Sequence, residues 1–264
     1  MSESLSMYQP LAEIVILLLG LIVGSFLNVC IYRLPRGLSV VRPRSHCPSC
    51  KALVQWFDNV PIVSYLFLKG RCRYCSATIS FRYPLIELLS AVLSWLVYRR
   101  FGIGVGYLFY FPFAASLLTV SAIDLDHGII PDEISIPGIA IGLIFAGFWP
   151  YLSLWDSLVG ILAGGGFLYL VGFFYGAATK REGIGGGDIK LMAMIGAFLG
   201  WKGSLFTIFA GSLIASLTGV SIMILRKADG KMPIPFGPFL SGAALLYLLA
   251  GDRIIWWYFS LLQP

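Results

Sequence analysis

Two aspartates lie at the ends of otherwise apolar segments, and they are the first sign of chemistry in this chain. Asp124 stands in AIDLDHGIIPD, and Asp188 follows three glycines in GIGGGDIKL. A charged carboxylate at the centre of a membrane helix costs about 2.5–3.5 kcal/mol or more, so such a residue is a functional-site hypothesis by default. Two carboxyl groups that share one proton can activate a water molecule. The pair therefore predicts aspartic proteolysis.

The neighbours of these aspartates leave two questions open. Gly186 and Gly187 would allow the backbone of another chain to come close to Asp188, which makes them candidates for substrate binding. The rival interpretation is that Asp188 is only a helix N-cap after a flexible loop. Asp124 and Asp126 are both candidate partners of Asp188, and on an ideal helix they point about 200° apart. Only one of them can face Asp188, and the chemistry alone does not show which.

Four of the five cysteines form two CxxC pairs, which is a spacing typical of a metal site. The pairs are Cys47 with Cys50 and Cys72 with Cys75. Four thiolates suit tetrahedral zinc, and the spacing is close to that of zinc ribbons. Redox chemistry is the rival, although disulfides are disfavoured in the cytoplasm. A loop of this size has little core of its own, so we expect the zinc to hold it together.

The composition predicts an all-α polytopic membrane protein. The chain has 264 residues, of which 58% are hydrophobic and only 12% are charged, whereas soluble domains have about 25% charged residues. A span needs about 20 apolar residues, and about eight segments qualify. A re-entrant loop is the rival interpretation for the short sixth segment. The expected spans are 12–32, 84–101, 104–123, 134–151, 157–178, 187–201, 204–225 and 234–251.

The positive charges predict the orientation. Fifteen of the nineteen Lys and Arg residues fall on the same side as the polar loop 33–82. Because cytoplasmic loops carry the excess of Lys and Arg, this loop is expected in the cytoplasm and the N-terminus outside. Asp124 and Asp188 then lie on the cytoplasmic side together. The net charge of +6 follows from this topology, so we expect no nucleic-acid partner.

Several motifs in order resemble bacterial type IV prepilin peptidases, which are bifunctional leader peptidases and N-methyltransferases. GSFLNVCIYRLP resembles the first-helix motif of that family, and the segment with the four cysteines resembles its cytoplasmic zinc domain. Three further motifs resemble its catalytic core. The matching segments are 24–35, 47–87, 124–132, 183–191 and 234–240.

The resemblance implies a specific activity at the bacterial inner membrane. Asp124 and Asp188 correspond to the catalytic aspartates of the family, and Asp126 becomes a neighbouring acid. A leader peptide would be cut from type IV prepilins or type II secretion pseudopilins at the cytoplasmic face, while their apolar helix stays in the lipid bilayer. The new N-terminal amine would then be methylated with S-adenosylmethionine.

The resemblance also implies three parts of the chain. Residues 1–32 would form the first transmembrane helix, 33–83 a cytoplasmic tetracysteine domain associated with methylation, and 84–264 a membrane-embedded aspartic peptidase core. Glu87 is a candidate for binding the substrate or the methyl donor. The rival interpretation is that Glu87 pairs with a basic residue of the loop.

Two other classes of protein share some of these features. A presenilin-type intramembrane protease has a similar GxGD motif, but the CxxC pairs and the IPFGPF sequence argue against it. An ion-coupled transporter could use intramembrane aspartates to bind protons or cations. Transporters place such sites near the midplane and often have repeated halves, whereas here both aspartates lie near one face.

Overall fold

The structure is a computed structural model that describes residues 2–180, 183–226 and 235–262. These residues form helices joined by loops, and among them there are two isolated β-bridges but no β-strand. The all-α prediction is therefore confirmed. The chain divides into two compact units, Met1–Thr119 and Val120–Pro264, and each is described by itself.

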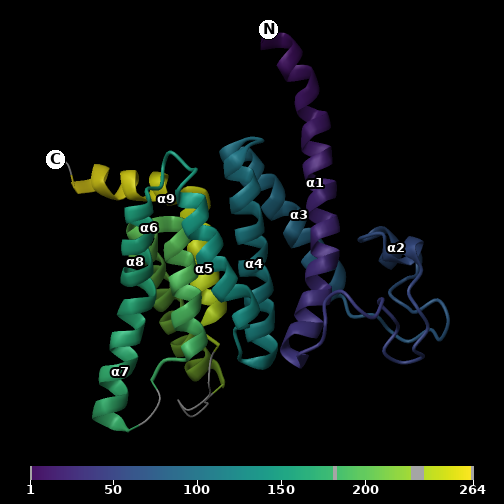
Figure 1. The fold of residues 1–264 in the computed structure, drawn as a ribbon. Coiled ribbons are helices and arrows are strands. Elements are labelled where there is room, and N and C mark those ends of the chain that lie inside the picture. Colours follow the sequence, from purple (N-terminus) through teal and green to yellow (C-terminus); the bar gives the residue numbers. More distant parts are fainter. Residues whose placement is uncertain (1, 181–182, 227–234, 263–264) are drawn as a thin grey trace. The chain divides into compact units, whose positions relative to one another are not determined.

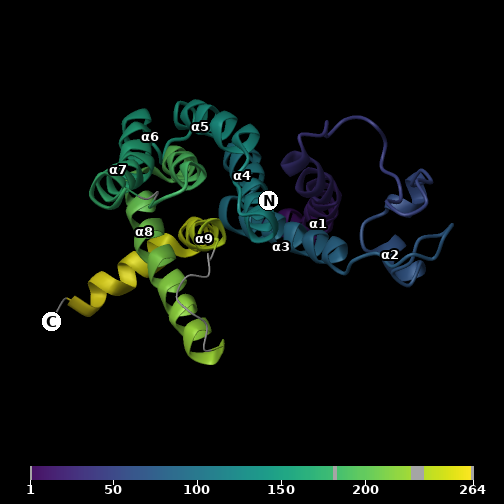
Figure 2. The same ribbon diagram turned by 90° about the horizontal axis from the view of Figure 1, so that it is seen from below.

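The first unit is built on two helices that pack closely along their length. These are α1 (Ser2–Arg33) and α3 (Arg82–Phe101), which lie side by side in Figure 1 and Figure 2. Gly20 and Gly24 of α1 face α3, and a Cβ at either position would lie within 2.6 Å of an α3 backbone atom. The absence of these side chains is what allows the close approach. Helix α4 (Val105–His127) begins in this unit and ends in the second.

The segment between α1 and α3 contains only short elements. It has the 3₁₀ helices η1 (Leu34–Arg36) and η2 (Trp56–Asn59) and the five-residue helix α2 (Val63–Phe67). None of these three elements contains a buried residue. Hydrophobic burial within these elements therefore does little to stabilise this segment.

Helix α8 lies at the centre of the second unit. It packs against α5, α6, η3, α7 and α9, which Figure 2 shows gathered around it. The contact with α6 is close because Gly160 faces Gly196, and a Cβ at either glycine would overlap the backbone of the other. The elements are α5 (Asp132–Ala146), α6 (Leu154–Ile161), the π-helix η3 (Leu162–Gly166), α7 (Phe167–Thr179), α8 (Gly186–Arg226) and α9 (Gly237–Leu262).

Five helices in the described part of the chain are long and apolar enough to cross a membrane, which supports a multi-pass membrane protein. The predicted count of eight is not confirmed. Helix α3 is not among the five, and α5 has only 15 residues because it ends at Ala146 and not at residue 151. The five stretches are Gln9–Arg36, Val105–His127, Leu154–Thr179, Gly186–Leu225 and Gly237–Trp257.

The sixth and seventh predicted spans belong to one helical run with a break in it. Helix α8 has 41 residues, which at 1.5 Å per residue would reach about 60 Å, twice the thickness of the hydrocarbon core. Gly200 interrupts the run with φ 68° and ψ −175°. A left-handed φ is open to glycine without steric cost. The break at Gly200 lies inside the predicted span 187–201, one residue before its end.

Candidate functional site

The second unit brings Asp124 and Asp188 together. Asp124 lies in the last turn of α4 and is only 5% exposed, while Asp188 lies in the first turn of α8 and is half-buried. The two carboxylates are close enough for the charge of Asp124 to act on Asp188. A charge on one carboxylate of such a pair disfavours a charge on the other.

Helix N-termini help both carboxylates to tolerate burial. The backbone N–H of Gly237, the first residue of α9, donates to Oδ2 of Asp124 at 2.9 Å. Asp188 lies within the first turn of α8 itself. Because the N-terminal end of a helix carries a partial positive charge, it stabilises a nearby anion. Gly237 has little room for a side chain, since a Cβ there would lie 2.7 Å from Oδ2 of Asp124.

The other acids of the DLDHGIIPD segment lie in different surroundings. Asp126 is exposed, in contrast to the buried Asp124. Asp132 accepts a hydrogen bond at 2.7 Å from Nζ of Lys190, which connects the start of α5 to the first turns of α8. Both partners of this ion pair are well exposed, so its contribution to stability is small.

The two candidate glycines differ in what surrounds them. A Cβ at Gly187 would lie 2.9 Å from Cβ of Ile130, so this glycine allows α8 to pack against the segment before α5. A Cβ at Gly186 would meet no described heavy atom within 4 Å. Gly187 thus has a packing role, and Gly186 borders open space next to Asp188.

The first unit brings the four CxxC cysteines together. Their sulfur atoms all lie within 4.8 Å of one another, with 3.8 Å between Cys47 and Cys75 and 4.0 Å between Cys50 and Cys72. Tetrahedral zinc with Zn–S bonds of about 2.3 Å needs sulfur atoms about 3.8 Å apart, so the cluster fits zinc. The backbone N–H of Cys50 is the main cause that lowers the pKa of the Cys47 thiol to about 6. The backbone N–H of Ala77 acts to lower the pKa of the Cys75 thiol, but burial and the neighbouring thiols raise this pKa to about 11.

The two CxxC pairs lie in turns with the same hydrogen bonds. In the first turn the N–H of Cys47 donates to the carbonyl of Ala52, and in the second the N–H of Cys72 donates to the carbonyl of Ala77. The residue after each pair, Lys51 or Ser76, has a φ near +60°. The β-bridges His46↔Leu53 and Arg71↔Thr78 close the two turns. We call them the first and second knuckle, spanning residues 45–54 and 70–79.

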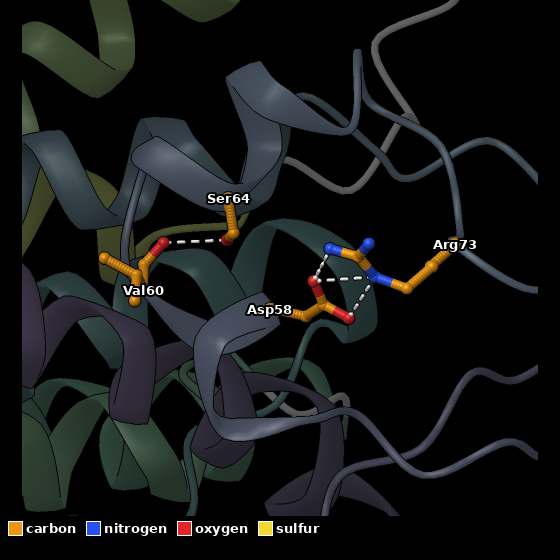
Figure 3. Close-up of polar contacts among 4 residues, drawn as sticks. All are labelled: Asp58, Val60, Ser64 and Arg73. Carbon is orange, nitrogen blue, oxygen red and sulfur yellow. Dashed lines mark hydrogen bonds and ion pairs between the residues drawn. The ribbon is translucent and has the colours of Figure 1, made fainter.

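An ion pair ties the second knuckle to the rest of the loop domain. Arg73 donates from Nη2 to Oδ1 of Asp58 at 2.6 Å and from Nε to Oδ2 at 2.9 Å, as Figure 3 shows. Asp58 belongs to η2 and its side chain is only 8% exposed. The hydroxyl of Ser64 donates to the carbonyl of Val60 nearby (Figure 3). Two parallel bonds to a mostly buried carboxylate fix the position of Arg73 well.

Glu87 is buried beneath the loop domain. It is 7% exposed, and its Oε2 accepts a hydrogen bond at 2.7 Å from the N–H of Ile62. Ser25 of α1 also hydrogen-bonds to Glu87. The partners of Glu87 are thus Ile62 and Ser25 and not the basic loop residue that the rival interpretation of Glu87 expects.

The turn held by Glu87 has an unusual backbone. Ile62 has φ 60° and ψ −49°, and the N–H of Val63 bonds to the carbonyl of Pro61. This is a γ-turn with positive φ, which is rare and strained, above all for a β-branched residue. Strain of this kind persists only where the surroundings hold it, and here the Glu87 carboxylate does so.

Two contacts of these sites are not visible in sequence patterns. The N–H of Gly237, which donates to Asp124, belongs to the IPFGPFL motif. The presence of this motif is the only sign of the contact in the sequence. The hydrogen bond from the N–H of Ile62 to Glu87 has no sign in the sequence beyond the preceding Pro61.

Comparison with known proteins identifies the family. The model of the bacterial peptidase A24 N-terminal domain matches residues 18–101, and that of the type IV leader peptidase family matches residues 111–220. A comparison with solved structures found no match.

Named relatives cover nearly the whole chain. A prepilin leader peptidase/N-methyltransferase of Pseudomonas aeruginosa is 40% identical, and one of Aeromonas salmonicida is 37% identical; each alignment covers 93% of both chains. A protein of the same name from Burkholderia pseudomallei is 36% identical over 88% of this chain and 84% of its own length. The chain therefore belongs to the type IV leader peptidase family.

Proposed function

We propose that this protein removes the leader peptide from type IV prepilins or type II secretion pseudopilins and then methylates the new N-terminal amine. The observation that carries the peptidase half is the pair of Asp124 and Asp188 in one unit, with each carboxylate next to a helix N-terminus. The names of the relatives, prepilin leader peptidase/N-methyltransferase, support both halves.

The aspartate pair can carry out hydrolysis without a metal. The ionised carboxylate takes a proton from water, and the resulting nucleophile attacks the scissile carbonyl carbon. The protonated carboxyl group donates a proton to the carbonyl oxygen as negative charge develops there. The helix N-termini of α8 and α9 are already oriented before the reaction, so stabilising the ionised carboxylate requires no rearrangement. Gly186, with open space beside it, is where a substrate backbone can approach.

The membrane location suits such a substrate. A pilin-like precursor has a long apolar helix after its cleavage site, and this helix can remain in the bilayer while the leader is cut. The excess of Lys and Arg around the loop 33–82 supports a cytoplasmic active site in the bacterial inner membrane.

The first unit would serve the methyltransferase half. Cys47, Cys50, Cys72 and Cys75 would hold one structural zinc ion, which would join the two knuckles into one domain. The methyl donor would be S-adenosylmethionine, which supplies an electrophilic methyl group on a sulfonium. Hydrolysis and methyl transfer then use groups of different units.

The test uses the full-length protein in detergent with a pilin-like precursor. Asp124→Asn and Asp188→Asn should each lower leader cleavage about 10²–10⁴-fold, since Asn has a similar volume but cannot share the proton. The matched control is Asp126→Asn, which should keep most of the activity. If Asp126→Asn is inactive and Asp124→Asn is active, the assignment of the pair is wrong. If no variant affects cleavage, the protein is not an aspartic peptidase.

A further inference from the structure

A cavity of about 680 Å³ lies in the first unit between the α1–α3 pair and both knuckles. This volume is within the range of about 300–1,000 Å³ typical of small-molecule sites. The helices contribute Asn28, Arg33 and Glu87 to its lining, and the loop domain contributes Asp58 and Tyr65. Asn28, Arg33 and Glu87 are each less than 9% exposed, so the cavity has buried polar groups on its helical side.

The lining has five charged groups, Arg33, Arg42, Asp58, Arg73 and Glu87, which differ in how they are neutralised, and Arg42 is exposed. Arg33 donates to the carbonyls of Ser39 and Pro43 at 2.8 and 2.7 Å, so it serves to hold the loop. The Asp58 carboxylate is paired with Arg73. Glu87 has hydrogen-bond donors but no ion pair among the described residues. A buried anion of this kind is expensive unless a cation joins it.

We propose that this cavity is the site of methyl transfer, where S-adenosylmethionine binds and the Glu87 carboxylate receives the cationic N-terminus of the cleaved pilin. This inference rests on the proposed methyltransferase function and assigns its location. The acceptor and the donor both carry positive charge at the reacting atoms, an ammonium and a sulfonium. A single buried carboxylate therefore attracts both groups and reduces their mutual repulsion.

The reaction balances with Glu87 as the base. The α-ammonium of the pilin gives a proton to the carboxylate, which leaves a lone pair on nitrogen. The nitrogen then bonds to the methyl carbon, and the bond from methyl to sulfur breaks with its electrons moving to sulfur. The products are a methylated ammonium, S-adenosylhomocysteine and a protonated Glu87, which returns its proton to water.

The location also explains why a peptidase of this kind carries a tetracysteine domain. Cys47 and Cys72, one from each knuckle, line the cavity. A metal that joins the two knuckles would therefore fix the wall of the cavity that lies opposite α1 and α3. The strained turn at Ile62 is held by the same Glu87 carboxylate. The position of the loop domain therefore depends on the proposed base.

Glu87→Gln separates the charge of this residue from its structural role. Glutamine keeps an oxygen that can accept the hydrogen bond from Ile62 but loses the negative charge. The full-length protein is loaded with zinc, and two quantities are measured: binding of labelled S-adenosylmethionine by equilibrium dialysis, and methylation of a precleaved pilin peptide. We expect the variant to bind the donor about tenfold more weakly and to methylate about 10²-fold more slowly.

Two further variants serve as checks. Glu13→Gln is the matched control, because Glu13 of α1 also bonds to α3, through Trp95 and Arg99, and does not line the cavity. It should bind and methylate like the wild type. Ala52 does line the cavity, so Ala52→Trp should block donor binding while zinc content stays at one ion per chain.

The outcomes distinguish this inference from the proposed function. If the wild type methylates the peptide and Glu87→Gln binds and methylates equally well, the assignment of Glu87 is overturned while the function stands. If Ala52→Trp retains zinc and binds the donor normally, the cavity is not the donor site. If the wild type transfers no methyl group, the proposed methyltransferase function itself fails.

Discussion

The aspartate pair and the Glu87 cavity both bury a carboxylate, but they stabilise it in different ways. Asp188 lies in the first turn of α8, and Asp124, in the last turn of α4, accepts a hydrogen bond from the N-terminus of α9. The positions of α8 and α9 follow from packing within the second unit. Glu87 lies in α3, and its hydrogen-bond partners are Ser25 of α1 and one strained turn of a loop domain with little core. The helical site should therefore keep its geometry without a metal, whereas the loop site should depend on the cysteine cluster.

The largest expected effect is a reciprocal loss of the two activities. Asp188→Asn should lower cleavage 10²–10⁴-fold and still methylate a precleaved peptide. Cys72→Ser leaves three thiolates, should lose zinc, and should depress methylation more than cleavage. The measurements are leader cleavage, methyl incorporation from labelled S-adenosylmethionine, and zinc by elemental analysis. Equal loss of both activities in both variants would mean that the protein has one shared site.

A smaller effect is expected from Gly237→Ala. The added Cβ would lie 2.7 Å from Oδ2 of Asp124, so the carboxylate or the start of α9 must move. A displacement of about 1 Å at reacting groups costs on the order of 10²-fold in rate, so cleavage should fall by about this factor. Gly242→Ala in the same helix, where a Cβ meets no described atom within 4 Å, is the control. Methylation of precleaved peptide should be unchanged in both variants.

Substitution of the two glycines before Asp188 should distinguish an effect on helix packing from an effect on substrate binding. Gly187→Ala forces a contact of 2.9 Å with Ile130, and overpacking of this kind costs about 1–3 kcal/mol. It should lower the thermal stability of the protein. Gly186→Ala meets open space, so it should leave stability unchanged and raise the KM for the precursor. Identical thermal melts for the two variants would contradict the packing role of Gly187.

The smallest expected effect concerns the ion pair of Asp132 and Lys190. Both side chains are more than 40% exposed, and such pairs contribute about 0–1 kcal/mol. Lys190→Met should change cleavage by less than about fivefold, although Lys190 lies only two residues from Asp188. A loss as large as that of Asp188→Asn would show that Lys190 takes part in the chemistry.

Residue type and spacing predicted several of the side chains that make up the two candidate sites, while tertiary packing determines which of them lie together. The cysteine spacing predicted the cluster, and the orientation argument placed Asp124 and Asp188 on one side. The residues alone could not choose between Asp124 and Asp126, because the difference depends on the start of α9, more than a hundred residues away. Hydropathy likewise separates 187–201 from 204–225 but does not show that only Gly200 interrupts α8.

The repeated hydrogen bonds of the knuckles have a consequence for the order of folding. Each knuckle is closed by bonds that span at most nine residues, from Val54 to Ser45 in the first and from Ile79 to Gly70 in the second. Contacts this local form early, because little chain entropy is lost in closing short loops. The metal needs sulfur atoms from both turns, which are 25 residues apart in sequence. Zinc would thus bind last and complete the loop domain only after both turns have been synthesised.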